Sequence, residues 1–147
     1  RAHETEGQDY YFMTIENFRN HIEQDHFVEW EQVYEGRYYG TLKSEVERIE
    51  AINCSVVFDV DVEGGLKIKQ HFGNNLLAVF IRPPSIENLR ERLIARNTET
   101  AESLEIRLNK SIKELSYENR FDNIIINDYF EQSCIKAETL VNAFLSR

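Results

Sequence analysis

The sequence predicts an α/β fold in which helices flank a parallel sheet, and three apolar segments carry that prediction. They are CSVVFDVDVEGG (54–65), LLAVFIRPPS (76–85) and FDNIIINDYF (121–130). Each contains a continuous apolar run bounded by turn residues, which is typical of a strand buried on both faces of a parallel sheet. Segments with helical periodicity lie between them, and alternation of strands with helices favours the layered α/β class.

The first part of the chain is expected to hold a helix, irregular strands and a second helix. Residues 14–24 predict a helix with Thr14 as its N-cap, because apolar residues then recur on one face. The aromatic-rich stretch 27–41, FVEWEQVYEGRYYGT, predicts short, irregular strands. Ser44 and Glu47 have the spacing of a capping box, which predicts a short helix after them.

The remaining elements complete the alternation of strands and helices. A Gly-Gly turn at 64–65 is expected to end the first apolar strand. Two prolines break the second strand, and Ser85 then caps a helix over 86–96. The polar stretch 97–103 predicts a mobile bridge, and a final helix is expected over 133–145.

Composition argues against two classes of partner. The net charge of −9 disfavours general nucleic-acid binding, which needs a surplus of Lys and Arg to displace counterions. No apolar stretch approaches the roughly 18 residues that span a bilayer.

The two cysteines, Cys54 and Cys134, indicate reduced thiols of a cytoplasmic protein, with a single disulfide as the alternative. A monomer and a homodimer are both compatible with the sequence.

Glu29 is an acid within an apolar stretch, beside the only tryptophan, Trp30. Burying a carboxylate without hydrogen-bond donors is unfavourable, so two interpretations remain. In one, Glu29 is an exposed acid on an edge strand. In the other, it accepts from a ligand with two adjacent donors, which the Watson–Crick edge of guanine offers and adenine does not. A buried acceptor that the wrong ligand leaves unpaired discriminates strongly.

Two further groups of residues suit a phosphorylated ligand. One group is the stretch Tyr39, Gly40 and Thr41, which combines a phenol, a backbone without a side chain and a hydroxyl, and this combination suits phosphate oxygens. The other is Arg1, whose guanidinium can bind phosphate bidentately. Alternatively, Tyr10, Tyr38 and Tyr39 are ordinary core aromatics.

Polar residues also follow two of the predicted strands. Asp59 and Asp61 lie on one side of the first strand, and Asn127 follows the third. Because ligands gather at the carboxyl ends of parallel strands, the two acids suit hydrated magnesium or a nucleoside. Alternatively, they only cap the following turn.

Three arginines lie around the polar bridge. Arg92 and Arg96 are four residues apart on one helix face, and Arg107 follows the bridge. Arginines on a hinged flap neutralise phosphoryl charge as a site closes, whereas isolated arginines would be ordinary surface residues.

In this order and spacing, the segments resemble the guanylate kinases, which phosphorylate GMP with ATP. The segments that carry the resemblance are RAHETEGQDYYF, FVEW, YYGT, FDVDVEGG, IRPPS, RLIARNTET and IIINDYF. The resemblance implies a P-loop kinase core of parallel strands and helices, with a small mixed GMP-binding lobe and a helical lid. The implied parts of this single domain are a lobe at 1–48, a core at 49–96 and 111–147, and a lid at 97–110.

The resemblance also implies site residues, position by position. The residues implied to bind GMP are Arg1, Tyr10, Glu29, Tyr39, Thr41 and Asp61, with Glu29 on the guanine edge. Glu4 and Asp59 would lie near the phosphates and Mg²⁺ through water, with no direct metal ligand implied. The residues implied to approach the transferring phosphoryl group are Arg92, Arg96 and Arg107. Asn127 would lie near the ATP base.

One family feature is absent from these 147 residues. The family's GxxGxGK[ST] motif, whose amides and lysine cradle the ATP phosphates, does not occur, and neither does the strand before it. Because the chain begins with Arg1 and its only methionine is Met13, residues are expected upstream. The 147 residues alone are therefore expected to bind GMP weakly and to transfer no phosphate.

An alternative is a guanylate-kinase-like binding module. Such modules keep the fold, lack catalysis and use the GMP pocket for protein ligands. The retained arginines at 92, 96 and 107 favour the enzyme, because an interaction module has no need of them.

Overall fold

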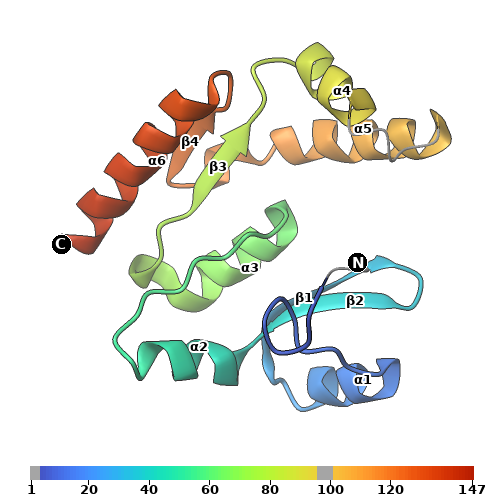
Figure 1. Ribbon diagram of the computed structural model, residues 1–147, viewed down its shortest axis with the longest axis vertical. Helices are drawn as coiled ribbons and strands as arrows, with labels where there is room; N and C mark the ends of the chain where they lie inside the picture. The colour runs from blue at the N-terminus through green and yellow to red at the C-terminus, as the bar shows by residue number, and fades with distance from the viewer. Residues whose placement is uncertain (1–3, 96–100) are drawn as a thin grey trace. The chain divides into compact units, whose positions relative to one another are not determined.

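The computed structural model describes residues 4–95 and 101–147, and the chain divides into two compact units, Arg1–His71 and Phe72–Arg147. The first unit holds an antiparallel hairpin with helices, and the second a parallel strand pair with helices (Figure 1). The α/β class is thus confirmed. In the described ranges, no helix is both long and apolar enough to span a membrane.

In the first unit, two strands pair as a hairpin between helices. Its elements are α1 (Ile15–Glu23), β1 (Phe27–Tyr34), β2 (Arg37–Leu42), α2 (Lys43–Glu50) and α3 (Val62–Phe72). The expected N-cap of α1 is confirmed, because Thr14 Oγ1 accepts a hydrogen bond from Asn17 N at 3.2 Å. Phe18, the buried residue of α1, stacks on Phe27 with ring centroids 4.4 Å apart, which attaches the helix to β1.

The hairpin confirms the expected strands and fixes which side chains meet. β1 and β2 are antiparallel, and Glu29 pairs with Thr41 and Trp30 with Gly40. A Cβ built on Gly40 would lie 2.8 Å from the carbonyl oxygen of Glu29 and 2.9 Å from Trp30 Cβ. The strands therefore approach as closely as they do only because position 40 has no side chain.

The predicted capping box at Ser44 is wrong. α2 begins at Lys43, with Leu42 as its N-cap and no side-chain cap hydrogen bond. β2 runs directly into the helix, and Lys43 N donates to the carbonyl oxygen of His26 at 2.9 Å. A backbone acceptor thus satisfies a first-turn donor, and Ser44 lies inside the helix.

Lys43 also forms an ion pair, which supports a pH prediction. Its Nζ lies 2.6 Å from Asp25 Oδ2, and this hydrogen bond, followed by the attraction between the charges, lowers the pKa of Asp25. The pair therefore stabilises the fold above the ordinary aspartate pKa, and this contribution disappears as the pH falls through the lowered value. In Lys43→Ala, NMR titration of the Asp25 carboxyl carbon should show a pKa closer to ordinary. Lys113→Ala should leave it unchanged, and an unmoved Asp25 pKa in Lys43→Ala would contradict the assignment.

The strand expected in 54–65 is absent, and so is the Gly-Gly turn. Residues 54–61 belong to neither sheet of the described structure, and Val57 is 91% exposed. Gly64 and Gly65 lie in the first turn of α3, where Asp61 Oδ1 accepts from Gly64 N at 2.9 Å. An apolar run needs a pairing strand to become a buried strand, and Asp61 starts a helix here instead.

In the second unit, β3 (Val79–Arg82) and β4 (Asn123–Ile126) pair in parallel, as predicted. Phe80 and Ile125 are nearly fully buried. Ile81, Ile124 and Ile126 are 40–53% exposed, however, so the expected burial on both faces is wrong. With only two described strands, each strand is an edge, and fewer of its side chains are covered.

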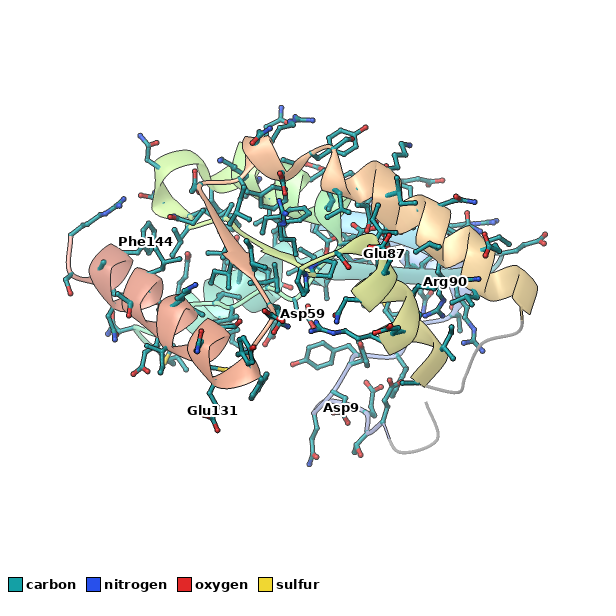
Figure 2. The ribbon with its side chains drawn as sticks, turned by 90° about the horizontal axis from the view of Figure 1, so that it is seen from above. Asp9, Asp59, Glu87, Arg90, Glu131 and Phe144 are labelled. Atoms are coloured by element: carbon teal, nitrogen blue, oxygen red, sulfur yellow. The ribbon has the colours of Figure 1, made fainter. Side chains whose placement is uncertain are left out.

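Helical segments precede and follow each strand of this pair (Figure 1). The helical elements of this unit are η1 (Gly73–Asn75), α4 (Ile86–Ala95), α5 (Ala101–Leu115), η2 (Glu118–Arg120) and α6 (Phe130–Leu145). The predicted cap of α4 is confirmed, because Ser85 Oγ accepts from Asn88 N at 3.1 Å. α4 packs on α5, where Arg90 Nη2 lies 3.8 Å from Glu105 Oε1 (Figure 2).

Candidate functional site

Glu29 is buried and incompletely hydrogen-bonded. It lies in β1 with 8% of its surface exposed. Thr41 Oγ1, from the paired position of β2, donates to Glu29 Oε1 at 2.9 Å. Within residues 4–95 and 101–147, this is the one hydrogen bond that the Glu29 carboxylate accepts. A buried carboxylate has room for several donors, so Glu29 retains the capacity to accept from a ligand.

The first turn of α3 lies against the other oxygen of this carboxylate. A Cβ built on Gly64 would be 3.3 Å from Glu29 Oε2 and 3.5 Å from Asp61 Oδ1. The amino end of a helix carries partial positive charge, which favours a carboxylate beside it. The structure therefore brings together three predicted residues, Glu29, Thr41 and Asp61. Asp61 also caps α3, whereas the alternative considered for it was the cap of a turn.

A cavity of about 510 Å³ lies next to this cluster. Its volume falls within the roughly 300–1,000 Å³ typical of small-molecule sites. Four predicted residues line it: Glu4, Tyr10, Tyr39 and Thr41. The Tyr10 and Tyr39 rings meet edge to face at 5.7 Å, and both are partly exposed, so these tyrosines are not buried core residues.

Glu29 itself lines a second cavity of about 350 Å³, together with Trp30 and Lys67. Phe27 is the one lining residue that these two cavities share. Lys67 Nζ donates to the Trp30 carbonyl oxygen at 3.0 Å and lies 5.6 Å from the centre of the Trp30 ring. Sequence reasoning missed Lys67, because it comes from α3, 37 residues along the chain.

A charged pair that was also missed lines the larger cavity. Arg48 donates from Nε and Nη2 to the two carboxylate oxygens of Glu45, at 2.9 and 2.6 Å. Tyr11 OH lies 3.3 Å from Glu45 Oε2. The Arg48 hydrogen bonds hold the pKa of Glu45 below its ordinary value. The i,i+3 spacing of the pair in a predicted helix was the available signal.

Four further predicted residues lie in described parts of the chain. Asp59 is exposed in the irregular segment before α3 (Figure 2). In the second unit, Arg92 is half-buried on α4 and Arg107 is exposed on α5. Asn127 follows β4, and its backbone N–H donates to the Arg82 carbonyl oxygen at 2.8 Å. The remaining two predictions, Arg1 and Arg96, lie outside the described residues.

Comparison with known proteins decides the family. The pattern that defines the guanylate kinases matches residues 1–144, almost the whole chain. The chain belongs to the guanylate kinase family. It is similar to the guanylate kinase of Bacteroides fragilis, with 45% identity over 145 residues that make up 99% of this chain and 71% of the relative. The guanylate kinase of Porphyromonas gingivalis is 50% identical over 128 residues, covering 87% of this chain and 68% of the relative.

A solved structure extends the likeness to the fold. The crystal structure of guanylate kinase from Anaplasma phagocytophilum has a TM-score of 0.77 and 26% identity, covering 97% of this chain and 69% of that one. The α/β architecture thus fits the P-loop kinase fold of the family. With relatives of this kind over nearly its full length, the chain is an enzyme of the guanylate kinase type.

Proposed function

We propose that the chain binds GMP through Glu29 and contributes most of the GMP site of an ATP-dependent GMP kinase. The observation that carries the proposal is the buried Glu29 carboxylate, which accepts a hydrogen bond from Thr41 and retains the capacity for more. Guanine presents N1–H and an exocyclic amine side by side, and one carboxylate accepts from both. Adenine offers no such pair and leaves the buried acceptor unsatisfied, which penalises AMP.

The phosphate end of GMP lies toward the two tyrosines in this proposal. Thr41 and Tyr39 are two residues apart on β2, so their side chains share a face of the strand about 7 Å apart. Tyr10 meets Tyr39 edge to face, and both rings line the cavity, which supports a role for the two phenols at the phosphate. Arg1 adds a guanidinium to this phosphate site, and Asp61 is a further partner for guanine.

The other proposed residues serve phosphoryl transfer. An oxygen of the GMP phosphate attacks the γ-phosphorus of ATP, and the bond to the ADP oxygen breaks. The residues proposed to neutralise the charge on the transferring group are Arg92, Arg96 and Arg107, and Asn127 adjoins the ATP base. We divide the chain accordingly into a GMP-binding lobe at 1–48, a core at 49–96 and 111–147, and a lid at 97–110.

Magnesium fits this assignment as a partner of ATP. Glu4 and Asp59 are carboxylates, the hard oxygen donors that Mg²⁺ accepts, directly or through water. Among the described residues, no group of three His, Cys, Asp or Glu side chains could hold a metal ion. When bound with ATP, the cation would supply neutralisation of phosphate charge, and Glu4 and Asp59 would hold it through its water ligands.

The 147 residues alone should bind GMP without transferring phosphate, because they contain no GxxGxGK[ST] motif. The test incubates the chain with ATP, Mg²⁺ and GMP and measures ADP formation, with GMP and phosphopeptide binding measured in parallel. GMP binding without GMP-dependent ADP is the expected result. ADP formation at an ordinary kinase rate would contradict the requirement for the motif. Phosphopeptide binding without GMP binding would identify a protein-binding module instead.

A further inference from the structure

Gly64 occupies a confined position next to the Glu29 carboxylate. It is buried in the first turn of α3. A Cβ at this position would lie 3.2 Å from Val60 Cβ, 3.3 Å from Glu29 Oε2 and 3.5 Å from Asp61 Oδ1. Favourable carbon–carbon contacts are about 3.5–4.0 Å long, so the distance of 3.2 Å to Val60 Cβ is too short for relaxed packing. The distance of 3.3 Å to the Glu29 oxygen is also tighter than ordinary van der Waals contact.

The three neighbours differ in their freedom to move. Val60 Cβ is attached directly to the backbone, and Asp61 Oδ1 is held by its 2.9 Å hydrogen bond from Gly64 N. The Glu29 carboxylate lies at the end of a longer side chain, so it is the group that a methyl at position 64 would displace. Thr41 holds its other oxygen at 2.9 Å, and any displacement of Oε2 also strains that bond.

We infer that Gly64 is a positioning residue that sets guanine selectivity, an inference that rests on the proposed role of Glu29. The absence of a side chain at position 64 lets both carboxylate oxygens lie where the two guanine donors need them. A displacement of a few tenths of an ångström weakens a pair of charge-assisted hydrogen bonds whose geometry is strict. AMP, which does not use those bonds, is affected far less.

The test measures dissociation constants of GMP, IMP and AMP by calorimetry for the 147-residue chain and for Gly64→Ala. IMP retains the N1–H donor of guanine but lacks its amine, so it reports on one of the two bonds. Gly64→Ala should weaken GMP binding about tenfold and change AMP binding less than about twofold. Gly65→Ala is the matched control, because it adds the same methyl to the same turn, about 100° around the helix axis, and should retain the preference for GMP.

Each outcome bears on one claim. If the unmodified chain does not prefer GMP to AMP, the proposed role of Glu29 fails. If it does prefer GMP and Gly64→Ala keeps the full preference, the inference about Gly64 fails.

NMR of the unmodified chain gives a second test that does not depend on how the variant folds. The Gly64 amide signal should shift on adding GMP and not on adding AMP, and an unmoved signal would overturn the inference.

Discussion

Replacing Glu29 by alanine should weaken GMP binding about a hundredfold while leaving AMP binding within about threefold. Hydrogen bonds to a charged group contribute about 1.5–3 kcal/mol each, and the variant loses two of them, so a hundredfold is a conservative expectation. Isothermal calorimetry with both nucleotides measures the effect directly. The preference for guanine should largely disappear, because Glu29 is the proposed acceptor for both donors of the guanine edge and Asp61 is then the only proposed acidic partner of the base.

The matched control for this variant is Glu35→Ala. Glu35 is exposed in the turn of the same hairpin and lines neither described cavity. The Glu35→Ala substitution removes the same charge from the same unit, so a long-range effect of charge on GMP affinity would appear in both variants. If the two variants lose GMP affinity equally, or if Glu29→Ala keeps the preference for GMP, Glu29 does not recognise guanine.

Gly40→Ala should destabilise the chain by about 2–3 kcal/mol. The added methyl would lie 2.8 Å from the carbonyl oxygen of Glu29 and 3.0 Å from Phe27 Cδ1, and a strand backbone cannot move away without opening the hairpin. Because whole domains are stable by only about 5–15 kcal/mol, a loss of this size is easily measured. Urea unfolding followed by the fluorescence of Trp30, the only tryptophan, reports on the hairpin itself.

Gly36→Ala provides the comparison within the same hairpin. Gly36 has a φ of +73°, but a Cβ there would meet only Ile15 Cδ1, at an ordinary 3.5 Å. The expected loss is therefore about 1 kcal/mol, from the left-handed backbone alone. A larger loss for Gly36→Ala than for Gly40→Ala would show that close strand packing at position 40 is not what limits the hairpin.

Local signals in the sequence predicted most of the secondary structure. Thr14 and Ser85 each precede an amphipathic segment, and both cap a helix as expected, because an N-cap acts on its own first turn. The apolar runs at 79–82 and 123–126 pair as parallel strands, as predicted. In each case, the residues that decide the structure are close in sequence or form one strand pair.

The failures arose where a distant partner decides the outcome. The apolar run beginning at Cys54 has the composition of a buried strand, but no described strand pairs with it. Asp61 was placed on that strand, whereas it caps α3, which begins at Val62. Ser44 was given a capping role that the backbone carbonyl of His26 makes unnecessary. None of these partners can be identified from the local sequence.

The candidate site was predictable in its residue types and less so in its surroundings. The position of Glu29 within an apolar stretch correctly indicated an unusual acid, and the structure buries it beside Thr41. Gly64 and Lys67 were not anticipated as its neighbours, because the sequence pattern predicted a turn where α3 begins. The sequence pattern therefore identified Glu29 as an unusual acid, but it did not predict that α3 lies beside its carboxylate.

The central claim is that the first unit recognises guanine through the Glu29 carboxylate. The measurement that tests it most directly is a calorimetric titration of the unmodified 147-residue chain with GMP, IMP and AMP under identical conditions. The account predicts the affinity order GMP, then IMP, then AMP, because these nucleotides offer two, one and none of the required donors. Equal affinities for GMP and AMP would contradict it.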